Sequence, residues 1–131
     1  MYPMTREGRP GIAIHALPAN TSTLTCLAND TAYDQVFSRQ IEVIGRRDDL
    51  LIALSGSGNS PNVLRAIEAA RALGMKTFGI FGYNGGKALP MVDDALHVAI
   101  DDMQLAEDVQ LIACHIVMRS LLESPPGTAR A

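Results

Sequence analysis

The chain has 131 residues, of which 47% are apolar, and its formal net charge at pH 7 is −3. This length favours one domain with a sizeable core, and the slightly acidic composition gives no electrostatic reason to bind nucleic acid or an anionic membrane. No apolar run approaches the roughly 20 residues that cross a bilayer, and the N-terminal segment lacks the apolar centre of a signal peptide, so we expect a cytoplasmic protein with no membrane partner.

Changes in composition divide the chain into three parts. Residues 1–10 combine prolines with alternating charges, which predicts an irregular N-terminal arm. Residues 11–122 carry the regular apolar patterns of one domain. Residues 123–131 include Pro125 and Pro126 and are expected to form a flexible C-terminal tail.

The front of the domain is expected to hold a strand and a short helical segment. Gly11–Leu17 is an apolar run that predicts a strand, and Pro18 would end it. A helical turn over residues 24–28 follows, with Ser22 or Thr23 as its N-cap.

Helices and strands alternate along the rest of the domain. A polar break at Asn29–Thr31 precedes a predicted helix, because the apolar residues that follow share one helical face. Gly45 is expected to end this helix. The elements expected after it are a strand over 50–54, a helix over 61–73, a strand over 76–81, a helical turn over 88–91, a strand over 95–100 and a helix over 103–122. Apolar strands joined by helices predict an α/β fold whose mostly parallel sheet is covered on both faces. The apolar positions of the last helix spread over a broad face, which predicts burial on more than one side.

Two cysteines, Cys26 and Cys114, lie far apart in the sequence, and each has apolar neighbours. This pattern is typical of buried free thiols in a reducing compartment rather than of a disulfide or a metal site.

A loop of small and hydroxylated residues joins the strand over 50–54 to the helix that begins at Pro61. Proline is tolerated in a first helical turn, and Ser60 is placed to be the N-cap. The start of a helix offers unpaired N–H groups and a partial positive charge, and glycines let backbone amides approach an anion closely. The loop therefore predicts a phosphate site, with a tight turn in which serine only caps the helix as the alternative. The residues expected to contact the phosphate are Ser55, Gly56, Ser57 and Ser60.

The segment Ser55–Ser60, together with the helix over 62–71, resembles the sugar isomerase (SIS) domain, and within it the phosphoheptose isomerases. Other segments that fit this family are Leu27–Asp30, Val36–Gln40, Gly82–Lys87 and Glu107–His115. The resemblance covers about Arg9 to Leu122 and implies a three-layer, flavodoxin-like fold. Family members also carry an N-terminal helical region, a further strand and a helix with a His and a Glu, so the resemblance implies an N-terminally truncated domain.

Four further site residues come from the resemblance. It implies that Asn29 and Asp30 hold the sugar, whereas the local pattern alone favours Asp30 as a helix cap. Glu107 and His115 lie two helical turns apart on nearly one face, where they can bind zinc or act as an acid–base pair. The alternative is a solvated glutamate and a half-buried histidine. Phosphoheptose isomerases carry Gln and His at these positions, and both reach a metal, so Glu107 departs from the family and the zinc site implied here is incomplete.

The resemblance implies an aldose–ketose isomerase that interconverts sedoheptulose 7-phosphate and heptose 7-phosphate through an enediolate, with Glu107 and His115 as the catalytic residues. The alternative is a non-catalytic SIS module that senses a phosphosugar or docks a protein. A third possibility is a subunit that completes the pocket of another SIS chain. The apolar last helix and an open sheet edge predict a homo-oligomer, either a dimer or a tetramer.

Overall fold

Three parallel strands form the centre of the structure, a computed structural model in which residues 12–123 are described. Each strand pairs with the next in the order β1-β2-β3. The strands are β1 (Leu50–Ser55), β2 (Lys76–Phe81) and β3 (Asp94–His97), and the α-helices are α1 (Thr21–Asp30), α2 (Ser38–Ile44), α3 (Pro61–Ala72) and α4 (Met103–Glu123). Short 3-10 turns occupy Leu17–Ala19 (η1), Tyr33–Gln35 (η2) and Leu89–Met91 (η3). The predicted α/β fold with a parallel sheet is confirmed.

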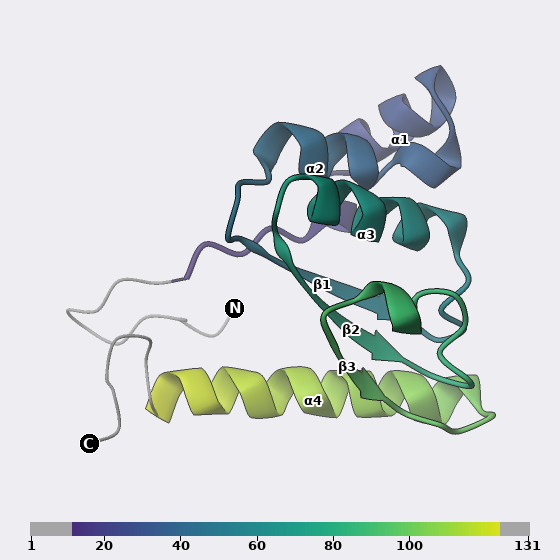
Figure 1. Cartoon of the computed structure of the whole chain (residues 1–131), viewed down its shortest axis with the longest axis vertical. Coiled ribbons are helices and arrows are strands. Elements are labelled where there is room, and N and C mark those ends of the chain that lie inside the picture. Colours follow the sequence, from purple (N-terminus) through teal and green to yellow (C-terminus); the bar gives the residue numbers. More distant parts are fainter. Residues whose placement is uncertain (1–11, 124–131) are drawn as a thin grey trace.

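Helices lie on both sides of the sheet (Figure 1), but only the side of α3 is well covered, because Ile52 of β1, on the other side, is 52% exposed. Phe81 of β2 packs with Ile67 of α3 in the main core cluster, and both side chains are fully buried. Residue Ile80 points to the other face, since side chains alternate along a strand, and its carbonyl accepts a hydrogen bond from Gln110 Nε2 of α4 at 3.4 Å. The result is three layers, with α1, α2 and α3 on one side and α4 on the other.

Helix α3 begins and ends where the sequence predicts. Pro61 occupies its first turn, and Gly74 follows its C-terminus with a φ of 75°. Gly74 N donates to Arg71 O at 3.0 Å and Met75 N donates to Ala70 O at 3.0 Å, which is the Schellman pattern that a glycine in this conformation permits.

The front of the domain differs from the expectation. Residues 12–16 form no strand, and Gly11 lies outside the described residues. Pro18 lies inside η1, because its fixed φ suits the first turn of a helix as well as it suits a strand end. Helix α1 is longer than predicted, and its N-cap is Asn20, whose Oδ1 accepts from Thr23 N at 3.1 Å.

Two later elements are shorter than predicted. Strand β3 ends at His97 rather than at residue 100, because its partner β2 ends at Phe81, which pairs with His97. Helix α2 begins only at Ser38, since η2 takes up the residues before Val36. Its end at Gly45 is as predicted.

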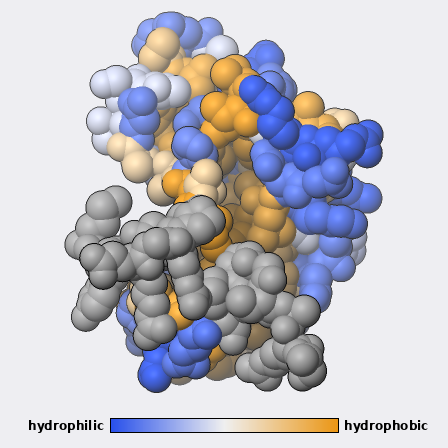
Figure 2. Space-filling model, turned by 90° about the vertical axis from the view of Figure 1, so that its left-hand side faces the viewer, coloured by the Kyte–Doolittle hydropathy of each residue, from blue (hydrophilic) through white to orange (hydrophobic). Residues whose placement is uncertain are grey.

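Burial differs from the expectation at two places. Cys26 and Cys114 are both exposed, because each lies on a helix side that no other described element covers. Helix α4 runs over the predicted residues and one further, yet within this chain Ala106 is its only buried residue. Four of its apolar side chains, Leu111, Ile112, Ile116 and Val117, are instead more than half exposed. Figure 2 shows hydrophobic residues in a band down the middle of the face that it presents.

The remaining domain boundaries concern residues outside the described range. The arm over 1–10 and residues 124–131 of the predicted tail both lie there, whereas Glu123, the first residue of that predicted tail, is the last residue of α4. Within residues 12–123, no helix combines the length and the apolar character that crossing a membrane requires.

Candidate functional site at the carboxyl ends of the strands

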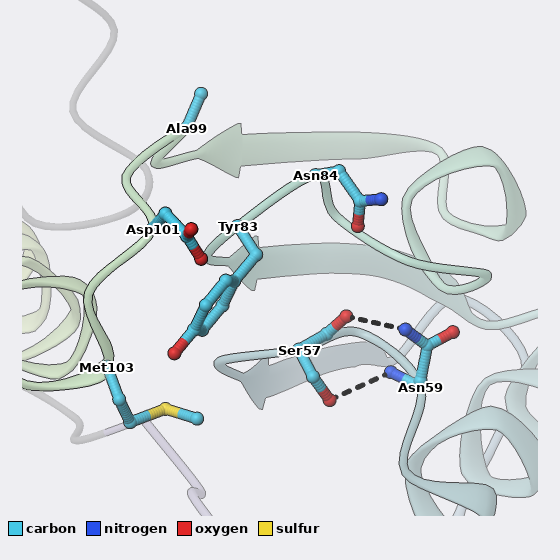
Figure 3. Close-up of a pocket in the computed structure, with 7 residues that line it drawn as sticks. All are labelled: Ser57, Asn59, Tyr83, Asn84, Ala99, Asp101 and Met103. Atoms are coloured by element: carbon cyan, nitrogen blue, oxygen red, sulfur yellow. Dashed lines mark hydrogen bonds between the residues drawn. The ribbon is translucent and has the colours of Figure 1, made fainter.

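A cavity of about 600 Å³ opens where the three parallel strands end (Figure 3). Its volume is typical of a site for a small molecule, and crevices beyond the carboxyl ends of parallel strands are the usual binding sites of such sheets. The segments that follow β1, β2 and β3 and the first turn of α4 all contribute to its lining. The lining residues are Ser57, Asn59, Tyr83, Asn84, Ala99, Asp101 and Met103.

The loop after β1, here called the serine loop (residues 55–60), uses only some of its backbone donors. Gly58 N donates to the buried Ser55 Oγ at 3.1 Å, and Asn59 N donates to Ser57 Oγ at 3.2 Å. Among the hydrogen bonds within residues 12–123, none uses the N–H groups of Gly56, Ser57 or Ser60. These three donors are available to an anion.

Ser60 occupies the N-cap position of α3, but its hydroxyl does not cap the helix. Its carbonyl accepts from Val63 N at 3.0 Å and from Leu64 N at 3.1 Å, which is all that it contributes to the first turn. Ser60 is therefore the N-cap residue, as predicted, but its backbone alone starts the helix and its side chain does not cap it. The hydroxyl is left without a helical partner.

A second loop, residues 82–87, packs directly against the serine loop. Gly58 has a φ of 64°, and a side chain there would overlap the carbonyl of Gly85, so glycine is required at this position. The two loops are joined by Ala88 N, which donates to Gly58 O at 2.9 Å, and by Gly82 N, which donates to Gly56 O at 2.8 Å.

Asn59 fixes the two loops together through its side chain. Its Nδ2 donates to Ser57 O at 3.0 Å, and its Oδ1 accepts from Lys87 N at 3.1 Å. Both ends of the carboxamide are thus engaged within the protein, so Asn59 holds the shape of the cavity.

The start of α4 closes the cavity on its other side. Met103 lies against Gly56, where any side chain would overlap its sulfur atom. Asp102 caps the helix, since its Oδ1 accepts from Leu105 N at 3.0 Å, as the sequence predicts for this acidic pair. Asp101 is left to line the cavity.

Asn29 and Asp30 lie in the last turn of α1 rather than in a break before a helix, and neither lines the cavity. Asn29 Nδ2 donates to Asp30 Oδ1 at 2.8 Å, and Cys26 Sγ donates to Asp30 Oδ2 at 3.3 Å. The hydrogen bonds from Asn29 and Cys26 lower the pKa of Asp30. The same Asp30 carboxylate raises the pKa of the Cys26 thiol, which favours the neutral thiol.

Glu107 and His115 are both exposed on α4. Glu107 follows the cavity residue Met103 by one helical turn and does not itself line the cavity, and His115 lies about 12 Å beyond Glu107 along the helix axis at 1.5 Å per residue. Across residues 12–123, no three His, Cys, Asp or Glu side chains come together in a group that could hold a metal ion. Glu107 and His115 on their own do not complete a four-ligand zinc site.

Several cavity residues were missed from the sequence. Tyr83, Asn84 and Asp101 follow the second and third predicted strands directly, and the carboxyl ends of parallel strands meet at one edge of a sheet. Applying that rule to every strand, and not only to the first, would have found them.

The fold and the site define an α/β protein whose ligand cavity is built from a Ser/Gly loop, a second glycine loop and a helix start. The sequence model of the SIS domain family matches residues 1–82, and the chain belongs to this family.

Curated relatives with similar sequences are phosphoheptose isomerases. The Helicobacter pylori (strain P12) enzyme is 45% identical over 109 residues, which cover 83% of this chain and 57% of the relative. The Desulfovibrio desulfuricans enzyme is 44% identical over 109 residues, covering 83% of this chain and 52% of the relative. The chain thus spans little more than half the length of these relatives.

Solved structures of phosphoheptose isomerases share the fold. The one from Neisseria gonorrhoeae has a TM-score of 0.84 and 33% identity, and the match covers 86% of this chain and 63% of that one. The one from Francisella tularensis has a TM-score of 0.81 and 31% identity, covering 85% of this chain and 60% of that one. The three-layer fold that the resemblance implied is therefore confirmed.

Proposed function

We propose that this chain binds a phosphorylated sugar as part of a phosphoheptose isomerase that interconverts sedoheptulose 7-phosphate and heptose 7-phosphate. The observation that carries the proposal is the group of three unengaged N–H donors at Gly56, Ser57 and Ser60 beside a cavity of about 600 Å³. The similarity to named phosphoheptose isomerases supports the choice of sugar.

The phosphate would occupy the serine loop. The free N–H groups there, the hydroxyls of Ser57 and Ser60, and the positive end of the α3 dipole all favour a doubly charged ester. Ser55 would support the phosphate site indirectly, because its Oγ accepts a hydrogen bond from Gly58 N and so stabilises the conformation of the loop. The carbon chain of the sugar would then extend into the cavity.

Isomerisation moves a proton between neighbouring carbons. A base removes the proton beside the carbonyl, an enediolate forms, and the same group returns the proton to the other carbon. We assign this role to Glu107, which follows the cavity residue Met103 by one helical turn of α4, and we assign His115 to proton exchange with the sugar oxygens. Asn29 and Asp30 remain proposed sugar contacts, and Asp30 offers a carboxylate whose lowered pKa keeps it charged.

We propose zinc as the metal that Glu107 and His115 would bind. Glu107 and His115 are suitable donors, but the described residues place no third donor beside them, so no catalytic step is assigned to a metal. A cytoplasmic location is likewise proposed from the composition alone.

We also propose that the protein is a homo-oligomer. Ile112 and Ile116 on α4 are 55% and 62% exposed, and Ile52 on β1 is 52% exposed. Covering these side chains with further copies of the chain would remove a large apolar area from water. Light scattering after size exclusion tests the proposal, and a stable monomer would contradict it. If the chain is instead a subunit that completes the cavity of another SIS chain, the mass measured by light scattering should increase only when that partner chain is present.

A second function is favoured by one observation. Glu107 and His115 do not line the cavity, which suits a module that binds a phosphosugar as a signal or docks a protein without turning the sugar over.

Calorimetry with sedoheptulose 7-phosphate and a coupled isomerase assay separate these functions. We expect binding by the natural protein, no measurable binding by the Ser55→Ala, Ser57→Ala double variant, and unchanged binding by Ser22→Ala, an exposed serine on α1. Because the Ser55 and Ser57 hydroxyls both accept hydrogen bonds within the loop, from Gly58 N and from Asn59 N, Ser60→Ala is measured as well, since the Ser60 hydroxyl makes no cap hydrogen bond. Binding without turnover, with and without zinc, would place the sensor function first. Equal affinity in the double variant would contradict the proposed phosphate site.

A further inference from the structure

Tyr83 has an unusual backbone conformation at the cavity. Its φ is 47°, a value that L-residues with large side chains rarely adopt. The turn Gly82–Gly85 is closed by Gly85 N, which donates to Gly82 O at 2.9 Å, and Tyr83 is the first of its two central residues. Asn84, the second central residue, has no positive φ, so the turn has the pattern of type II′, whose first central residue is usually glycine.

Two hydrogen bonds hold Tyr83 in this conformation. Tyr83 N donates to Ile100 O at 3.2 Å, and His97 Nε2 donates to Tyr83 O at 2.9 Å. The backbone donor and acceptor of this one residue are therefore both fixed, the acceptor by the last residue of β3 and the donor by the segment that follows β3. A strained residue persists where its surroundings fix it in this way, and such residues cluster at binding sites.

The side chain of Tyr83 is directed into the cavity. Figure 3 shows its ring extending between Ser57 on one side and Asp101 and Met103 on the other. The ring is half-buried and belongs to neither cluster of the hydrophobic core. Its hydroxyl takes part in no hydrogen bond among those found within residues 12–123.

We propose that Tyr83 is a sugar-binding residue that fixes the position of the carbon chain while the serine loop holds the phosphate, an inference that rests on the proposed phosphosugar function. The flat ring presents an apolar face to the C–H groups of the sugar, and the free hydroxyl exchanges a hydrogen bond with a sugar hydroxyl. Glycine at this position would relieve the backbone strain, but it would remove the aromatic ring that lines the cavity.

The two parts of the ligand can be tested separately with sedoheptulose 7-phosphate and inorganic phosphate as calorimetric probes. Tyr83→Ala keeps the positive φ but removes the ring, Tyr83→Gly removes both the ring and the strain, and Tyr83→Phe removes only the hydroxyl. Tyr33→Ala is the matched control, since Tyr33 is 62% exposed on η2 and lies outside the cavity.

We expect Tyr83→Ala and Tyr83→Gly to weaken sedoheptulose 7-phosphate binding by about tenfold or more, the value of an aromatic contact together with a hydrogen bond. Tyr83→Phe should weaken it by about twofold to tenfold, the value of one hydrogen bond. Inorganic phosphate should bind all variants as it binds the natural protein. Tyr83→Gly should also fold with an undiminished thermal midpoint, so it decides the question even if Tyr83→Ala fails to fold.

Three results would overturn the inference. If the natural protein and Tyr83→Gly bind the sugar phosphate with equal affinity, Tyr83 has no role in sugar binding, while the proposed function still holds. An equal loss of affinity for both probes would make Tyr83 a support of the serine loop rather than a sugar contact. Natural protein that binds inorganic phosphate but not sedoheptulose 7-phosphate would overturn the proposed sugar and this inference with it.

Discussion

Helices α3 and α4 flank the same sheet, but they bury very different shares of their residues. Four of the 12 residues of α3 are buried, whereas Ala106 is the single buried residue among the 21 of α4. The core between α3 and the sheet is thus complete within one chain. The apolar residues of α4 are not covered in this way. The spacing of apolar residues in the sequence therefore identifies an apolar helix, but it does not tell which part of the protein, or which other molecule, packs against that helix.

Strand β1 repeats this asymmetry on a smaller scale. Ala53, on the side of α3, is buried, and Leu51 packs against the same core. Leu50, Ile52 and Leu54 alternate with them and are each about half exposed, at 57%, 52% and 48%. The face of β1 away from α3 and the surface of α4 are therefore the parts of the structure that a further copy of the chain would cover.

The largest predicted effect compares an isoleucine on each helix. Ile67→Ala on α3 should reduce the free energy of unfolding by about 2–5 kcal/mol at every protein concentration, because Ile67 is fully buried. Ile116→Ala on α4 should cost roughly 0.5 kcal/mol or less in dilute protein and more as the concentration rises, since oligomers gain stability by mass action. Urea denaturation at several concentrations measures both, and a large, concentration-independent loss for Ile116→Ala would mean that α4 is packed within one chain.

Charges on α4 should separate the copies of the chain in the proposed homo-oligomer. Ile112→Glu together with Ile116→Glu is expected to reduce the mass measured by light scattering to that of a monomer, because ionised carboxylates are costly to bury. Glu68→Lys, at an exposed position on α3, is the control and should leave the mass unchanged. An unchanged mass in the double variant would place the interface elsewhere.

The first turns of the two helices should respond differently to alanine. Asp102→Ala removes the side-chain cap of α4 and should cost about 1 kcal/mol of stability. Ser60→Ala at the same position of α3 should leave stability nearly unchanged, because that hydroxyl caps nothing, while it weakens phosphosugar binding. Thermal unfolding and calorimetry measure the two effects. A loss of stability in Ser60→Ala without a loss of affinity would reverse this assignment.

The smallest effect concerns pH at the amino end of the sheet, away from the cavity. Asp93 Oδ2 accepts from Thr77 N at 2.8 Å and from Thr77 Oγ1 at 2.9 Å, and these bonds, the backbone one first, lower the pKa of Asp93. A lowered pKa adds stability above the unfolded value of about 3.9, and this stability is lost as the pH falls through the lower folded value. Asp93→Asn should therefore be less stable at neutral pH and should show a smaller loss of stability between pH 5 and pH 2. An identical pH profile in the variant would contradict the role of this pair.

Local chemistry explains which parts of the fold were predictable. The two ends of α3 were predicted correctly from Pro61 and Gly74. A proline in the first turn and a glycine with positive φ after the last turn act on the backbone locally, so a few neighbouring residues are enough to recognise them. The end of β3 depends on where β2 ends, and the exposure of Cys114 depends on what covers α4, so neither can be derived from a local pattern.

The site divides in the same way. The serine loop was found from the sequence, since a strand, a Ser/Gly loop and a helix start are consecutive. Tyr83 was not found from the sequence, because its importance lies in its positive φ and in hydrogen bonds to residues distant in the sequence. One of these residues, His97, is 14 positions away. The roles of Asn29 and Asp30 came from the resemblance, those of Glu107 and His115 from the resemblance together with their helical spacing, and all four remain predictions.

The central claim is that the serine loop binds the phosphate of a sugar through backbone amides. Amide chemical shifts followed by NMR during a titration with sedoheptulose 7-phosphate test it most directly. We expect the signals of Gly56, Ser57 and Ser60 to move together and to saturate at one dissociation constant, while Thr77 at the opposite end of the sheet stays in place. Saturable binding that leaves these three amides unmoved would contradict the claim.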